Sequence, residues 1–196
     1  MNHIPVESLE KLSSYSSVLP WLHLPFRFRT AKKGWKLIST VIWDFFLLQN
    51  LHKFKITKHP VIFVDAPLDE KIPFEPSKVK TYMNFIPYFL KPTVMLIKRM
   101  GYKNAAPYLN EYLDFIATMY KNAASIYRFC MTTTHRPDYK KGKEFKTIHA
   151  ADPHLLCVPS LHVTIAAGTY AWFKQFFKKN IFEKDEADFY LNELFY

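Results

Sequence analysis

Ser160 and His162 are the residues whose types and spacing best suit chemistry in this sequence. Pro159 followed by Ser160 is typical of a chain stop and a helix N-cap, because a serine hydroxyl accepts a hydrogen bond from an unpaired amide one turn later. The apolar run 161–177 predicts a helix with His162 in its first turn. The free N–H groups at a helix start favour an anion such as phosphate, and histidine can give or take a proton. A phosphate-handling site and an ordinary helix start with a surface histidine are the two interpretations.

A helix predicted upstream of this site ends in a loop that carries Arg136. Apolar residues recur at helical spacing from Leu109 to Tyr127, which is typical of an amphipathic helix, and Pro107 suits its start. Pro137 disfavours helical backbone at the residue before it, so Arg136 should project from the loop. Residues 121–146 hold seven Lys or Arg and two acidic residues, a net +5 that fits either a solvated loop or a stretch that attracts phosphate.

Composition bounds the class of protein. A chain of 196 residues is about one domain and can bury a real core. Its 4 glycines argue against a nucleotide-binding α/β domain, and its two cysteines are no disulfide framework. A net charge of +10 with 18 Phe and 12 Tyr fits a membrane interface or a nucleic-acid surface. Because no nucleic-acid recognition motif accompanies the charge, no nucleic acid is expected as a partner.

The rest of the chain predicts short helices and loops. Residues 1–26 are expected to be an irregular arm with a short helix around Val6–Tyr15, and 37–48 a 12-residue apolar run, buried or interfacial, that is short for a membrane span. Prolines exclude a continuous helix over 52–78, where 61–64 is the only β-like run. Helix returns over 79–100, kinked or split by Pro87 and Pro92, and 138–151 is predicted to be a polar loop.

Three stretches in this order resemble a known family. They are Ile72-Pro73-Phe74-Glu75-Pro76, Thr132-Thr133-Thr134-His135-Arg136-Pro137 and Val158-Pro159-Ser160-Leu161-His162-Val163. The chain resembles the type 2 phosphatidic acid phosphatase superfamily over roughly residues 71–177, in particular its inositolphosphoceramide-synthase-like and sphingomyelin-synthase-like branch. The pattern and the resemblance together predict an all-α helical bundle. Residues 1–70 would form an N-terminal arm with a basic and apolar helix, and residues 71–196 a phosphatase-like helical domain.

The resemblance implies a site and a reaction. Arg136 corresponds to an arginine that holds phosphate oxygens, a task that suits its planar, permanently charged fork. Ser160 corresponds to a serine that hydrogen-bonds the phosphate, and His162 to the histidine that protonates the leaving oxygen. Arg128 is a weak substitute for a lysine that many members carry where Phe129 stands here. The implied substrates are phospholipid or sphingolipid phosphates and phosphodiesters, and the histidine-based reaction needs no metal or other cofactor.

The chain departs from that family in its nucleophile. The family's attacking histidine lies downstream of the second motif, but no histidine follows His162 in this sequence. We therefore expect either a phosphatase-like domain truncated at its C-terminus and completed by a further segment, or an inactive relative. Leu161 also stands where many members have glycine.

Two other classes of protein fit the residues. A non-catalytic helical protein that binds an anionic membrane surface or a partner fits the basic and aromatic composition. A metal site could be built from His149, Asp152, His154, Cys157 and His162, although their spacing matches no closed zinc pattern. Association with a membrane is the expected location, with a soluble cytoplasmic domain as the alternative.

Overall fold

The protein is an all-α helical bundle with one small sheet. The computed structural model describes residues 4–67, 71, 73–135, 139, 141–180 and 182–195. It is 69% helical, which confirms the predicted fold class. The chain divides into two compact units, unit 1 (residues 1–37, 85–116 and 165–196) and unit 2 (residues 38–84 and 117–164). The predicted domain boundary at residue 70 stays a prediction.

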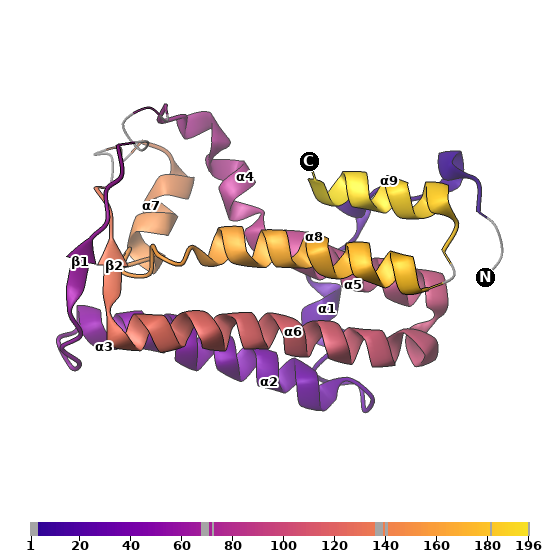
Figure 1. The fold of residues 1–196 in the computed structure, drawn as a ribbon, viewed down its shortest axis with the longest axis horizontal. Helices are drawn as coiled ribbons and strands as arrows, with labels where there is room; N and C mark the ends of the chain where they lie inside the picture. The colour runs from indigo at the N-terminus through magenta and orange to yellow at the C-terminus, as the bar shows by residue number, and fades with distance from the viewer. Residues whose placement is uncertain are drawn as a thin grey trace. The chain divides into compact units, whose positions relative to one another are not determined.

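The described chain combines short helices with a few long ones (Figure 1). The α-helices are α1 Leu19–His23, α2 Ala31–Val41, α3 Leu48–Lys53, α4 Val79–Met83, α5 Phe85–Met100, α6 Tyr102–Phe129, α7 Lys143–Ala151, α8 Leu161–Lys179 and α9 Lys184–Phe195. A π-helix, η3 Ile42–Leu47, joins α2 to α3, and 3-10 turns lie at η1 Val6–Ser8, η2 Leu12–Ser14 and η5 Pro76–Lys78. The strands are β1 Val61–Phe63 and β2 Met131–Thr133. Among the described helices, none is both long and apolar enough to cross a bilayer.

Unit 1 is built on a buried aromatic core. Tyr112 is fully buried in α6; its hydroxyl donates to the carbonyl of Phe89 at 2.9 Å and lies 2.9 Å from Thr169 Oγ1. The Trp172 and Phe173 rings of α8 pack against the Tyr112 ring, at centroid distances of 5.0 and 5.3 Å. Burial raises the pKa of Tyr112 far above its ordinary value, so the phenol stays protonated as a donor. One side chain thereby joins α5, α6 and α8 within this unit.

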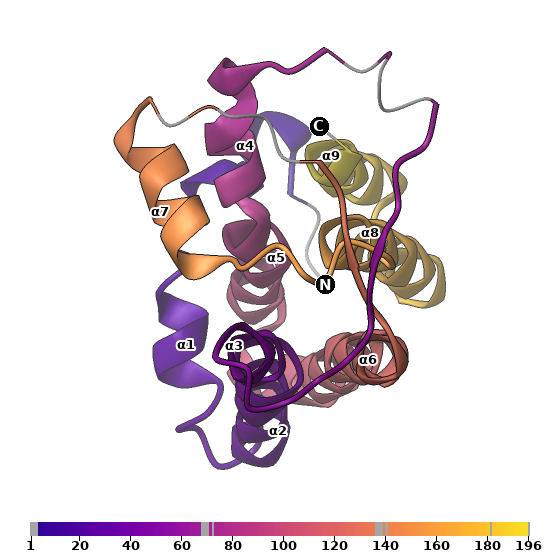
Figure 2. The same ribbon diagram turned by 90° about the vertical axis from the view of Figure 1, so that its left-hand side faces the viewer.

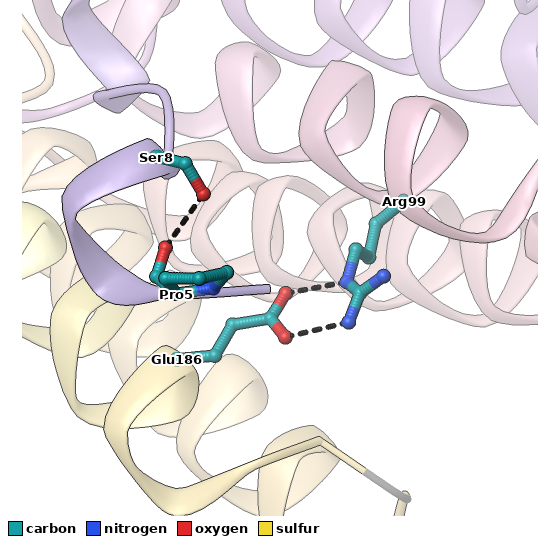
Figure 3. A network of polar contacts seen from close by, with 4 residues as sticks. All are labelled: Pro5, Ser8, Arg99 and Glu186. Atoms are coloured by element: carbon teal, nitrogen blue, oxygen red, sulfur yellow. Dashed lines mark hydrogen bonds and ion pairs between the residues drawn. The ribbon is translucent and has the colours of Figure 1, made fainter. Parts of the chain in front are cut away.

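A buried ion pair fastens α9 to α5 in unit 1 (Figure 3). The Arg99 guanidinium binds both carboxylate oxygens of Glu186, with Nε to Oε1 at 2.7 Å and Nη2 to Oε2 at 2.9 Å. The Glu186 side chain has no exposed surface, whereas Arg99 keeps 11% of its own. In the same view, the Ser8 hydroxyl donates to the carbonyl of Pro5 at 2.7 Å, closing the η1 turn. A buried charge without its partner is costly, so this contact is a point on which the position of α9 depends.

Replacing Glu186 with alanine should lower the free energy of unfolding by about 3–5 kcal/mol, because it removes the carboxylate that balances the buried Arg99 charge. Urea unfolding followed by circular dichroism measures the change. Glu10→Ala is the matched control, since it breaks the pair of Glu10 with Lys98, in which both side chains are about half exposed. We expect the control to shift the urea midpoint little. Equal shifts in the two variants would contradict the assigned role of Glu186.

Unit 2 is organised around the strand pair. β1 pairs in parallel with β2, with Val61 opposite Met131 and Phe63 opposite Thr133 (Figure 1). A further parallel bridge joins Thr132 to Leu156. The sequence indicated a β-like run at 61–64 but not the sheet, because that run alone gives no sign of the strand with which it pairs.

Two local predictions are wrong. The helix expected to start at Pro107 begins at Tyr102, because Gly101 takes φ +72 and ends α5 directly before it. A proline in the second turn costs α6 only one backbone hydrogen bond near its start.

The polar loop expected over residues 138–151 instead contains helix α7. Gly142, at φ +94, precedes its first residue. The Phe145 ring then packs against Phe74 and Tyr139, at centroid distances of 6.0 and 4.8 Å, and α7 lies beside α4 (Figure 2). The lysines of this stretch are typical of a polar loop, so its short apolar face was not recognised from the sequence.

Other expectations are confirmed. The helical stretch 79–100 is split as expected, but the break lies at Asn84, so Pro87 is in the first turn of α5. Helix α5 continues through Pro92. The apolar face predicted for α6 is buried, since Leu109, Ile116 and Tyr127 expose 0% of their surface. In the N-terminal arm, the short helix expected around Val6–Tyr15 is reduced to the 3-10 turns η1 and η2.

Candidate functional site

His162 and Ser160 line a cavity of about 260 Å³ in unit 2. The polar side chains around it come from the end of β2, from the segment that precedes α8, and from the first turn of α8. They are Thr134, Asp152, His154, Cys157, Ser160 and His162. Its apolar wall consists of Phe45, Tyr82, Leu156 and Leu161. The cavity thus gathers groups able to donate, accept and transfer protons beside a helix start.

Thr132 holds the segment before α8 in place. Its backbone N–H donates to the carbonyl of Leu155 and its carbonyl accepts from the N–H of Cys157, both at 3.1 Å. Its hydroxyl accepts from the N–H of Val158 at 2.7 Å and donates to the carbonyl of Val158 at 3.2 Å. The phenol of Tyr127 donates to the carbonyl of Pro159. The segment therefore docks on β2 and α6 through backbone groups of four residues, namely Leu155, Cys157, Val158 and Pro159.

The helix start at Ser160 is confirmed. α8 begins at Leu161, and the Ser160 hydroxyl accepts a long hydrogen bond of 3.5 Å from the N–H of Val163. This is the geometry of an N-cap residue. Ser160 also lines the cavity, so the same hydroxyl that caps the helix could contact a bound anion.

The His162 ring stacks on the Tyr82 ring, with centroids 4.2 Å apart and planes 20° apart. The ring is half-buried, not freely exposed. Loss of solvation lowers the pKa of His162 below its ordinary 6.5, and the nearby charge of Asp152 partly opposes that shift. His162 is therefore mostly neutral at pH 7, and an anion bound beside it would favour the imidazolium.

His154 and Cys157 are cavity residues that the sequence assigned only to an alternative metal site. The Nε2 atom of His154 lies 2.9 Å from Thr134 Oγ1, and the Cys157 sulfur lies 3.6 Å from Nε2 and 3.7 Å from Nδ1. The backbone N–H of His154 donates to Asp152 Oδ1 at 3.0 Å. His154 has φ +59, an uncommon conformation for a residue other than glycine. In the sequence, the only indication that His154 and Cys157 belong to the site is that they lie just before the Pro-Ser-x-His element.

The two arginines predicted to bind phosphate have different outcomes. Arg136 lies outside the described residues; Thr134, two positions before it, lines the cavity. Arg128 pairs with Asp44, the buried acid of η3, and is not one of the residues that line the cavity. A phosphate bound by Arg128 would have to compete with that carboxylate, and its role as a phosphate ligand stays a prediction.

A second cavity of about 300 Å³ adjoins this one. Tyr82 and His154 line both cavities. The walls of the second one are largely apolar and come from α4, α7 and the stretch before α4, in the residues Phe74, Val79, Phe145 and Ile148. A polar cavity and an apolar one that share two side chains suit a ligand with a charged head and an apolar tail.

The metal-site alternative is not supported by the described residues. Among them, no group of three or more histidine, cysteine, aspartate or glutamate side chains is arranged to hold a metal ion. Asp152, His154, Cys157 and His162 share the cavity, whereas His149 lines its apolar neighbour.

Comparisons with protein-family models, with curated proteins and with solved structures find no match for this chain. The interpretation of the site therefore rests on its geometry.

Replacing Thr132 with valine should lower the free energy of unfolding by about 1–3 kcal/mol, because the N–H and carbonyl of Val158 both lose their partner. Urea unfolding measures the loss. Thr132→Ser keeps the hydroxyl and is the matched control, so its midpoint should stay close to that of the wild type. A valine variant as stable as the serine variant would show that the hydroxyl does not hold this segment.

The His162 ring should titrate below pH 6.5, because burial disfavours its charged form. Proton NMR of the ring measures the midpoint, and inorganic phosphate should raise it, since an anion stabilises the imidazolium. By linkage, phosphate should bind more tightly as the pH falls through that midpoint. His162→Gln reports the part of this dependence that comes from the titration of phosphate itself. A midpoint above 6.5 without phosphate would contradict desolvation as the dominant influence.

Proposed function

We propose that the cavity around His162 binds the phosphate group of a lipid phosphate or phosphodiester, and that the chain is a phosphatase- or phosphotransferase-like domain. One observation carries this proposal. Thr134 of the second stretch and Ser160 and His162 of the third, separated along the chain, line one cavity of unit 2. Phe74 and Glu75 of the first stretch line the adjoining cavity. All three stretches that resemble the phosphatidic acid phosphatase superfamily therefore contribute to one pair of cavities.

The proposed roles follow from the chemistry of each group. The N–H groups at the start of α8 and the Ser160 hydroxyl would hydrogen-bond phosphate oxygens. His162, charged once the anion is bound, would protonate the leaving oxygen. Arg136 is proposed to bind two phosphate oxygens, as the resemblance implies. None of these roles requires a metal ion or a cofactor.

The adjoining cavity supports a lipid as the ligand. Phe74, Val79, Phe145 and Ile148 offer an apolar wall next to the polar cavity. Burial of an acyl chain against such a wall is favourable by about 25 cal/mol for each Å² of apolar surface. A free sugar phosphate or inorganic phosphate would gain nothing from that wall, so a lipid phosphate is favoured.

Isothermal titration of the full chain with dihexanoyl phosphatidic acid at pH 6 tests the proposal. We expect His162→Ala to weaken binding about ten- to a hundredfold, because a hydrogen bond to a charged group contributes about 1.5–3 kcal/mol. Release of phosphate from a panel of lipid phosphates is measured alongside. His23→Ala, which changes a histidine of α1 in unit 1, is the control and should bind like the wild type. Equal affinities of wild type and His162→Ala would remove His162 from the site.

A second candidate function is a non-catalytic role at an anionic membrane surface. Phe28 is 98% exposed, and the exposed rings of Phe26 and Trp35 contact each other beside Arg27 and Lys32 in unit 1. Exposed aromatic rings next to cations are typical of interfacial membrane binding. In the same experiment, salt-sensitive binding to phosphatidylserine vesicles without any binding of dihexanoyl phosphatidic acid would favour this candidate.

A further inference from the structure

The Cys157 thiol lies within reach of an imidazole in the candidate cavity. Its sulfur is 3.6 and 3.7 Å from the two ring nitrogens of His154, nearly equal distances that place it over the ring, so a hydrogen bond to one nitrogen requires a rotation of the imidazole. The other cysteine, Cys130, donates instead to the carbonyl of Met131 at 3.3 Å. Cysteine beside histidine is an arrangement that generates a thiolate, the reactive form of the residue.

The backbone around this pair is fixed from two sides. The Cys157 N–H donates to the carbonyl of Thr132 at 3.1 Å, and the His154 N–H donates to Asp152 Oδ1 at 3.0 Å. The Thr134 hydroxyl lies 2.9 Å from His154 Nε2 and orients the ring. The pair therefore has the three parts of an activated nucleophile, namely a thiol, a base and a group that orients the base.

The pair also faces the groups proposed to bind phosphate. Cys157, His154, Ser160 and His162 line the same cavity. Among the described residues, the other titratable groups around the thiol are Tyr82 and Asp152 on the cavity wall and the buried phenol of Tyr127, which senses the charge of Cys157. The phenol stays neutral because burial raises the pKa of Tyr127 well above its ordinary value.

We propose that Cys157, activated by His154, is the nucleophile of this cavity and accepts the phosphoryl group. This inference rests on the proposed function and names the attacking group of the same cavity. It differs from the histidine nucleophile that the resemblance implies. Cys157 would be a catalytic residue, His154 its general base and Thr134 a positioning residue.

The step balances with the groups of the cavity and water. His154 takes the thiol proton, the sulfur attacks phosphorus, and the bond from phosphorus to the alcohol oxygen breaks as that oxygen takes a proton from the His162 imidazolium. In the second half, water attacks the phosphorus of phosphocysteine and gives a proton to His162. The bond between sulfur and phosphorus breaks, and the thiolate recovers its proton from His154. The net reaction is hydrolysis of the phosphate ester.

The first measurement tests the thiol without any phosphate. The rate of alkylation of Cys157 by iodoacetamide is followed against pH in a Cys130→Ser chain. We expect the midpoint of the pH–rate curve at or below about pH 7.5, in the range of cysteines paired with histidine. His154→Ala should return it to about 8.5, the value of an ordinary thiol, and His23→Ala should leave it unchanged. A midpoint near 8.5 with His154 present would overturn the proposal.

The second measurement tests transfer. After incubation with para-nitrophenyl phosphate and acid-free quenching, intact mass and peptide fragmentation should place one phosphoryl group on Cys157, and Cys157→Ser should lose it. Label or phosphate release retained by Cys157→Ser would overturn the thiol as nucleophile but leave the proposed function standing, provided dihexanoyl phosphatidic acid still binds. Absence of that binding in the wild type would instead remove the proposed function, and with it the phosphoryl-acceptor role of Cys157.

Discussion

The site depends on the hydrogen bonds by which Thr132 holds the chain between Leu155 and Val158. One residue uses its N–H, its carbonyl and its hydroxyl to bind three residues of an irregular segment. That segment has no helix or sheet ladder of its own to satisfy its peptide groups, and buried peptide groups without partners are costly. Docking on β2 satisfies them, and it also fixes where His154, Cys157 and Ser160 lie.

Local order in this segment decides the electrostatics of the cavity. Because the Pro159 carbonyl is held by Tyr127, α8 starts where His162 reaches the Tyr82 ring. The stacked ring loses solvent, and that loss outweighs the attraction of Asp152, so the pKa of His162 falls. An imidazole that is mostly neutral at pH 7 and gains a proton when an anion binds would couple protonation to binding.

The sequence predicted those features that depend on nearby residues. The N-cap at Ser160, the start of α8 at Leu161 and the buried face of α6 follow from cap chemistry and apolar spacing, and all three are confirmed. It could not predict features set by distant residues. The pairing of β1 with β2 joins segments about 70 positions apart. The apolar face of α7 is covered by a distant residue, since the Phe145 ring packs against Phe74. His154 and Cys157 were recognised as chemically able residues, but their neighbours in space come from β2.

The buried contacts that stabilise unit 1 differ in kind from the contacts that position the candidate site in unit 2. Unit 1 has its densest interactions in the buried Tyr112 cluster and the Arg99–Glu186 pair, which involve no group of the candidate site. In unit 2, His154 and Cys157 lie on an irregular segment that individual hydrogen bonds, not a helix or a sheet ladder, hold in place. His154 has φ +59, a backbone conformation that few residues other than glycine adopt. Such a conformation persists only where surrounding contacts fix it. Contacts of Asp152, Thr134 and Thr132 provide that restraint. The polar groups that shape the cavity therefore also hold Cys157 and His154, its proposed nucleophile and base, in place.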